Sequence, residues 1–242
     1  TSTNLMTSYL TTILKVDNTH SYTLYIWLLP GYIAGAIICF WWFRWQRWRF
    51  RFLIAGGMAC FAFFFGSLYF TISPDSTYEM LFFPLFMRGL GMLTLIIAFA
   101  LFAVEDLPPK YLLSNAFFLI TFRSVLTPVM ASAFYSNTLY RLQQKYMVQL
   151  AENITLTDPL AASRYSSALT GNLQQGYGIN EATQLATNTM NNILQQQSTL
   201  LALKHILGWL FAVTLVIAVI SRFIPFHKTV RVPVIHTGED MV

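Results

Sequence analysis

Two arginines lie inside apolar stretches of this chain, where a charged side chain is costly. Arg88 interrupts FMRGLGMLTLIIAFALF, residues 86–102, and Arg123 lies near the middle of residues 112–135. Placing an arginine in hydrocarbon costs about 2.5–3.5 kcal/mol on insertion scales. Ionisable groups inside a membrane usually face the interior of a helix bundle and mark the route of an ion or substrate. Arg88 and Arg123 are therefore candidates for the charges of a transport cavity.

Both arginines also have a structural interpretation, which the sequence leaves open. Arg88 lies in the outer half of its stretch, so its side chain could snorkel to the headgroups or bond a neighbouring helix carbonyl. Arg123 lies where snorkelling is hardest. Its structural alternative is a polar contact that holds two helices together.

Polar side chains accompany Arg123 along the same stretch and favour a cavity-lining helix. They are Asn115, Thr121, Ser124 and Thr127. Pro128 adds a free backbone carbonyl near Ser124, because proline has no N–H to donate. Two aromatic residues, Tyr25 and Phe82, are further candidates for the lining of a hydrophobic site. Contact with lipid or with neighbouring helices is the alternative for both.

Glycines at close spacing predict tight helix crossings. Gly89 and Gly91 follow Arg88 directly, and Gly31 and Gly35 form a small-residue face beside a proline. Small residues let the backbones of membrane helices approach closely. We therefore expect these four glycines to lie at helix contacts.

Residues for metal binding, redox chemistry or hydrolysis are sparse. The four histidines are scattered, no CxxC or HExxH occurs, and both cysteines lie in apolar runs. The acidic residues of the apolar region lie at the ends of stretches, so a carboxylate for proton coupling is expected outside this segment. The sequence predicts no metal site, no cofactor and no enzyme active site.

Composition indicates an all-α integral membrane protein with the lipid bilayer as its surroundings. The chain of 242 residues is 55% hydrophobic and only 10% charged, with a mean hydropathy of +0.52. Soluble domains carry about 25% charged residues. The net charge of +5 is small and reflects the placement of loops, so nucleic-acid binding is not expected.

Five stretches are long enough to cross a bilayer, which takes about 20 apolar residues. They are residues 22–43, 52–72, 80–104, 112–135 and 201–221. Residues 1–14 look like the end of a sixth helix, so we expect a fragment of a longer protein. Residues 15–135 then hold four full helices with their short loops.

The distribution of lysine and arginine predicts the orientation of these helices. Basic residues gather in residues 44–51, in residues 105–111 and after residue 222, whereas the opposite short loops hold only Lys15. Positively charged loops remain in the cytoplasm. The tail, residues 222–242, is therefore expected in the cytoplasm and residues 136–200 outside it.

The segment 136–200 is polar and too long for a simple turn. Apolar residues at helical spacing predict amphipathic helices over about 137–152 and 180–200, each extending a membrane helix outward. Between them, Asp-Pro, Thr-Gly and Gly-Tyr-Gly predict turns. This extracytoplasmic helical hairpin is either a solvated link or a docking surface for a partner.

An ordered set of motifs resembles a known family. The run RGLG at 88–91, the sequence Leu107-Pro108-Pro109, Arg123, the long external loop and the short basic tail occur in that order. Over about residues 20–225 this set is similar to the C-terminal half of the fourteen-helix drug:proton antiporters of the major facilitator superfamily, in the EmrB/QacA branch. Two features depart from the family: Ser124-Val125-Leu126-Thr127-Pro128 stands where a glycine-rich run is usual, and FRWQRWRFR lacks an acidic residue.

The resemblance implies a major-facilitator-type bundle in the bacterial inner membrane. It implies a missing N-terminal bundle that holds the acidic coupling residues, and a helix-packing role for Arg88. Its members work with a HlyD-type periplasmic adaptor and an outer-membrane channel, and the loop 136–200 fits such a partner.

Two functions from different classes follow. The first is export of small amphipathic or hydrophobic compounds by proton antiport with alternating access. The alternative is a membrane scaffold that transports nothing and recruits a periplasmic partner through its long loop.

Overall fold

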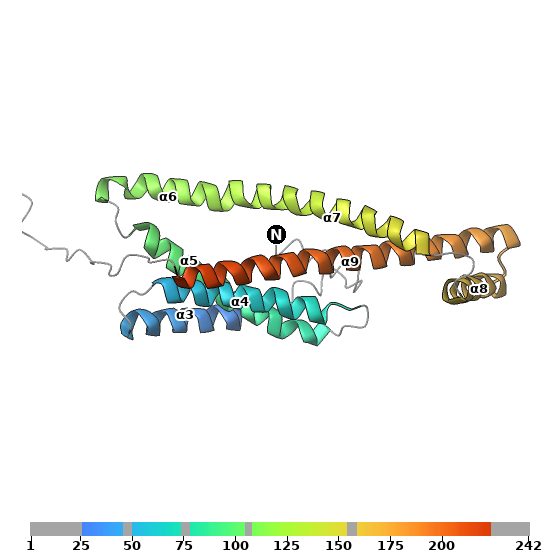
Figure 1. The fold of residues 1–242 in the computed structure, drawn as a ribbon, viewed down its shortest axis with the longest axis horizontal. Coiled ribbons are helices and arrows are strands. Elements are labelled where there is room, and N and C mark those ends of the chain that lie inside the picture. The colour runs from blue at the N-terminus through green and yellow to red at the C-terminus, as the bar shows by residue number, and fades with distance from the viewer. Residues whose placement is uncertain (1–25, 46–49, 74–77, 105–107, 154–158, 224–242) are drawn as a thin grey trace, which may run out of the picture. The chain divides into compact units, whose positions relative to one another are not determined.

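A computed structural model describes residues 26–45, 50–73, 78–104, 108–153 and 159–223 (Figure 1). Within these ranges every regular element is a helix. They are α3 (Leu28–Trp45), α4 (Phe50–Thr71), η1 (Tyr78–Leu81), α5 (Phe82–Val104), η2 (Pro109–Tyr111), α6 (Leu112–Thr121), η3 (Phe122–Leu126), α7 (Thr127–Asn153), α8 (Pro159–Gln174) and α9 (Ile179–Phe223).

Four of these helical stretches are long and apolar enough to cross a membrane. They are Phe50–Thr71, Glu79–Ala103, Leu113–Glu152 and Ile179–Phe223. The helix α3 is apolar but shorter, and its expected start at residues 22–25 lies outside the described residues, as does the expected partial helix 1–14. The all-helical fold agrees with the sequence analysis.

The chain divides into two compact units. A bundle unit comprises Tyr22–Thr71, Thr77–Val125 and Leu207–Val242, and a hairpin unit comprises Ile72–Ser76 and Leu126–Ile206 together with Thr1–Ser21. The division falls inside α9, which the structure has as one helix of 45 residues.

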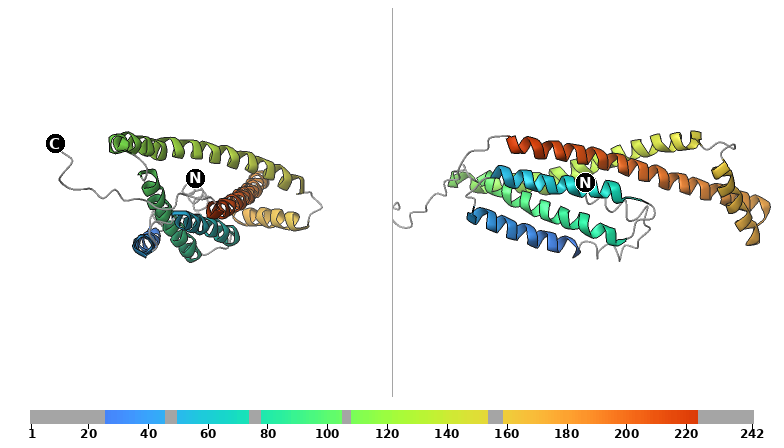
Figure 2. Two further views of the ribbon diagram at one scale, coloured as in Figure 1. Left: turned by 60° about the vertical axis from the view of Figure 1, so that its left-hand side comes forward. Right: turned by 60° about the horizontal axis from the view of Figure 1, so that its bottom comes forward.

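In the bundle unit, α5 packs against both α3 and α4 (Figures 1 and 2). Its core is a cluster of buried apolar side chains, namely Cys39, Phe50, Leu53, Ile54 and Ala98. The ring of Phe50 lies 6.1 Å from that of Phe43 and 6.2 Å from that of Phe102, so aromatic contacts join all three helices.

Glycines place the backbones of these helices in direct contact. A Cβ on Gly89 would lie 2.6 Å from the carbonyl oxygen of Leu28, and a Cβ on Gly31 would overlap the carbonyl oxygen of Phe86. At the crossing of α4 and α5, a Cβ on Gly91 would lie 2.9 Å from the carbonyl oxygen of Gly57. A Cβ on Gly35 would lie 3.1 Å from the Leu90 carbonyl oxygen. No larger residue fits at these contacts without moving backbone.

In the hairpin unit, polar side chains join α7 to α9. Gln143 donates a hydrogen bond from Nε2 to Thr199 Oγ1 at 2.9 Å, and the Tyr146 hydroxyl lies 3.1 Å from His205 Nδ1. Ala182 and Ala186 are fully buried in this unit. The expected helices over 137–152 and 180–200 are therefore parts of α7 and α9.

The segment between those helices differs from the expectation of a linker made of turns. Residues 159–174 form α8 (Figure 1). Gly171 lies inside this helix. Pro159 is the first residue of α8. Proline suits this position because an N–H there would have no partner within the helix. The expected turn at Thr170-Gly171 is wrong, because the alanine- and leucine-containing stretch around it favours helix.

The turn at Gly176 is present and has a clear cause. Gly176 has a φ of +90°, its N–H bonds the Leu173 carbonyl at 3.0 Å, and the Tyr177 N–H bonds the Asn172 carbonyl at 3.4 Å. These two bonds are the Schellman pattern, which ends a helix on a left-handed residue. Glycine adopts that conformation without steric cost.

Candidate functional site

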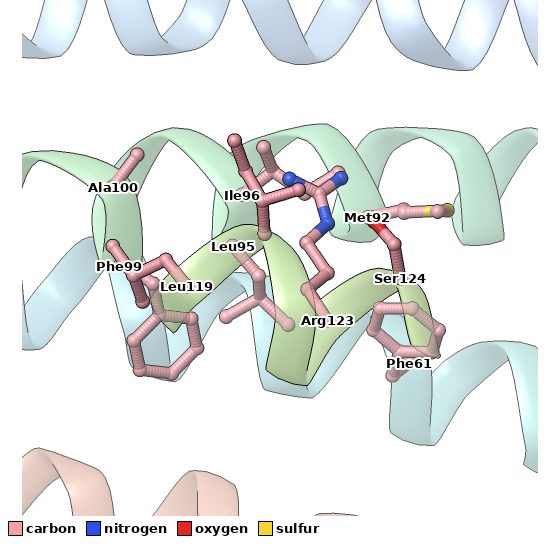
Figure 3. Close-up of a pocket in the computed structure, with 10 residues that line it drawn as sticks. Phe61, Met92, Leu95, Ile96, Phe99, Ala100, Leu119, Arg123 and Ser124 are labelled. Atoms are coloured by element: carbon pink, nitrogen blue, oxygen red, sulfur yellow. The ribbon is translucent and has the colours of Figure 1, made fainter. Parts of the chain in front are cut away.

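A cavity of about 520 Å³ lies within the bundle unit (Figure 3). Small-molecule sites in proteins typically measure about 300–1,000 Å³. The residues that line it are Phe61, Met92, Leu95, Ile96, Phe99, Ala100, Leu119, Ile120, Arg123 and Ser124. The walls are therefore mostly apolar, with one guanidinium and one hydroxyl.

One face of α5 forms half of the lining. Five residues of α5 line it, at positions 92, 95, 96, 99 and 100. Residues at these spacings lie on a single side of an α-helix. Residues 92–104 are apolar on every side of the helix except at Thr94, so the sequence alone does not distinguish this cavity wall from a core contact.

Arg123 is the charged residue of the cavity. Its side chain extends across the cavity toward α5, between Ile96 and Met92 (Figure 3). The guanidinium makes no ion pair or hydrogen bond with any residue in the described ranges. It therefore offers its N–H donors to whatever occupies the cavity.

The backbone that carries Arg123 is irregular. Residues Phe122–Leu126 form a π-helical segment between α6 and α7. Pro128 follows shortly afterwards and has no N–H for the carbonyl of Ser124, which interrupts the α-helical ladder at this point. Single π-helical turns inside α-helices occur frequently at functional sites. Here the irregular turn places Arg123 and Ser124 in the cavity lining.

A hydrogen bond connects the cavity wall to α3. The Tyr32 hydroxyl donates to Met92 Sδ at 3.3 Å, and Met92 lines the cavity. A change in the position of α3 would therefore act on a side chain of the cavity.

Comparisons with protein-family models, with curated proteins and with solved structures find no match for this chain.

Arg88 lies apart from the cavity lining. It is buried, with 5% of its surface exposed, and its Cζ lies 5.9 Å from the centroid of the Phe64 ring on α4. An arginine over an aromatic face gains electrostatic stabilisation from the ring. The two arginines that the sequence treats alike thus occupy different surroundings: Arg88 is packed between helices and Arg123 faces a cavity.

Asn115 is bound to a helix end and does not line the cavity. Its Nδ2 donates to the Ala103 carbonyl at 2.9 Å. Ala103 lies in the last turn of α5, where carbonyls lack partners within the helix. The amide of Asn115 therefore satisfies the end of α5 and fixes the start of α6 beside it.

The other polar and aromatic candidates lie outside the lining as well. Phe82 packs edge-on against Trp27, with centroids 5.7 Å apart. Thr127 and Pro128 open α7, Thr121 ends α6 without being among the lining residues, and Tyr25 lies outside the described residues. Of the polar candidates along residues 112–135, Arg123 and Ser124 reach the cavity. They lie one turn beyond Leu119 and Ile120, which also line the cavity.

The described residues contain no group of three histidine, cysteine, aspartate or glutamate side chains that could hold a metal ion. The cysteines Cys39 and Cys60 are free thiols in the helices α3 and α4.

Proposed function

We propose that this chain is part of a secondary active transporter that exports small amphipathic or hydrophobic compounds. The observation that carries this proposal is the apolar cavity of about 520 Å³ with the Arg123 guanidinium in its wall. Its apolar stripe on α5 suits the hydrophobic part of such a compound, and Arg123 suits a polar acceptor at one end.

The surrounding helices supply a means of movement. Crossings at glycines bring the backbones of α3, α4 and α5 into close contact. Helices packed in this way can shift as rigid bodies, which alternating access requires. The Tyr32–Met92 bond would transmit such a shift to the cavity.

The finer parts of the proposal follow from the motifs. The chain would be the C-terminal half of a major-facilitator antiporter of the EmrB/QacA kind in the bacterial inner membrane. Its C-terminus would be cytoplasmic, and the helical segment 136–200 extracytoplasmic. An N-terminal bundle would supply the proton-coupling carboxylates, and a HlyD-type adaptor with an outer-membrane channel would receive the exported compound.

Vesicle transport tests the proposal. The protein purified from its source membrane is reconstituted into liposomes, and an inside-acidic pH gradient is imposed across the bilayer. Uptake of a fluorescent hydrophobic dye is then followed. We expect uptake that requires both the protein and the gradient, and that an ionophore abolishes. Dye movement no faster than in protein-free liposomes would contradict transport.

A membrane scaffold is the second candidate, and the hairpin unit favours it. The helices α7 and α9 are joined by the Gln143–Thr199 and Tyr146–His205 contacts, so this segment forms ordered helices with largely exposed surfaces. A scaffold would retain a periplasmic partner in the absence of any transport. Partner capture together with no dye uptake would favour it over the transporter.

A further inference from the structure

Two arginines from distant parts of the chain meet at one aromatic ring in the bundle unit. The Cζ of Arg51, in the first turn of α4, lies 5.1 Å from the centroid of the Phe52 ring, and the Cζ of Arg222, in the last turn of α9, lies 4.3 Å from it. The two positive charges are thus no farther apart than the sum of these distances. Like charges at such separations repel, and an anion near both of them would offset that repulsion.

An unsatisfied donor lies beside the same ring. The Trp42 ring centroid is 6.0 Å from that of Phe52, and its Nε1 is buried without a hydrogen-bond partner among the described residues. Buried indole N–H groups normally find an acceptor. Two guanidiniums and one indole N–H therefore gather around a single ring, and the indole N–H lacks an acceptor among the described residues.

The described residues at this end of the bundle unit supply positive charge. Arg44 lies in the last turn of α3, and neither the first turn of α4 nor the last turn of α9 described here holds an acidic residue. Glu79 lies in η1, before the start of α5, whereas Phe102 near the end of α5 is the residue in contact with Phe50. Glu105 and Asp106 follow α5 in the sequence and lie outside the described residues.

Exposed aromatic side chains lie within two residues of Trp42 and Arg222 in the sequence. Phe40 and Trp41 on α3 and Phe223 on α9 are exposed by 64%, 61% and 79%. Tryptophans such as Trp41 gather where a membrane helix meets the headgroups, and the two phenylalanines add apolar surface beside it. A molecule with an anionic head and an apolar body would accept hydrogen bonds from the donors with its head and cover the exposed rings with its apolar part.

We propose that Arg51, Arg222 and Trp42 form a binding site for the phosphate of an anionic phospholipid, with the acyl chains against the exposed aromatic surface. Arginine matches the geometry of phosphate oxygens with two parallel N–H donors. Basic pockets between membrane helices bind the headgroups of anionic lipids. The site is separate from the Arg123 cavity and does not depend on transport.

Lipid binding to the purified full chain in detergent tests this site. Native mass spectrometry measures the affinity for phosphatidylglycerol and, as a comparison, for phosphatidylcholine of the same chain length. We expect a clear preference for phosphatidylglycerol. The double variant Arg51→Gln/Arg222→Gln should lower that affinity at least about fivefold, while Arg141→Gln on α7 should leave it unchanged. The double variant Arg51→Lys/Arg222→Lys keeps both charges and should retain part of the affinity for phosphatidylglycerol. It is the control for misfolding caused by the loss of both charges.

Several results would overturn the site. One is equal affinity of the wild type for both lipids. Another is an unchanged affinity in a folded Arg51→Gln/Arg222→Gln variant. The last is competition by inorganic phosphate that is as effective as competition by phosphatidylglycerol. Such competition would indicate a site for free anions. A large rise in the affinity for phosphatidylglycerol in the variant Glu105→Gln/Asp106→Asn would show that these carboxylates pair with the arginines in the wild type. That result would also contradict the proposal.

Discussion

At the scale of single residues, position on the helix face decides what each polar side chain does. Arg88 and Arg123 both interrupt apolar sequence, yet one is packed over Phe64 and the other extends into a cavity. Sequence could predict that each needs compensation, because a charged side chain inside an apolar membrane stretch is costly. It could not predict which compensation, because that depends on neighbouring helices.

Replacing Arg123 tests its role as the polar contact of the cavity. We expect Arg123→Gln to raise the KM for a transported compound by about tenfold or more, because a hydrogen bond to a charged group is lost. Arg123→Lys should retain part of the affinity, since the charge remains. The measurement is the initial rate of uptake into vesicles at a series of substrate concentrations. Arg141→Gln, which removes an exposed arginine of α7, is the matched control.

The glycines make a second residue-scale prediction. Gly89→Ala should destabilise the protein by about 1–3 kcal/mol, because the added methyl meets the backbone carbonyl of Leu28. Gly56→Ala is the control within the same bundle unit, since a Cβ there has no neighbour within 4 Å. Unfolding in detergent, followed by circular dichroism, compares the two. Equal stability of both variants would contradict the close crossing.

At the scale of elements, sequence periodicity predicts most helices and fails where a polar helix lacks a strong pattern. The apolar stretches 52–72 and 80–104 correspond closely to α4 and α5, because long apolar runs allow little else. The predicted stretch 112–135 does not end at residue 135, because the helix continues through η3 into α7. The amphipathic pattern over 137–152 predicts this outward extension. The helix α8 was missed because turn-forming dipeptides outweighed a weakly amphipathic stretch.

The end of α8 offers a prediction at this scale. Gly176→Ala should destabilise the α8–α9 connection by about 1–2 kcal/mol, because an L residue with a side chain is disfavoured at a φ of +90°. Gly178→Ala lies two residues away without a positive φ and should have little effect. Hydrogen exchange of the α8 amides, measured by mass spectrometry, should rise in the first variant alone. Faster exchange in both variants, or in neither, would contradict the assigned helix end.

At the scale of the whole molecule, one cavity connects the all-helical fold to the proposed transport. The sequence indicated the helices, the glycine crossings and Arg123, but the lining of α5 became recognisable only when the helices were placed together. A cavity is a property of several helices at once, so no single stretch of sequence encodes it. The proposed lipid site shows the same limit, since Arg51 and Arg222 are distant in the chain and share one ring.

Filling the cavity tests the central claim most directly. Ala100 lines the cavity, and Ala100→Phe would place a ring in it; Ala59→Phe, at an exposed position of α4 outside the lining, is the control. The measurement is dye uptake into vesicles driven by a pH gradient, with equal amounts of each inserted protein. We expect Ala100→Phe to lose most of the uptake and Ala59→Phe to keep it. Unchanged uptake in Ala100→Phe would show that the transported compound does not pass through this cavity, and would contradict the account.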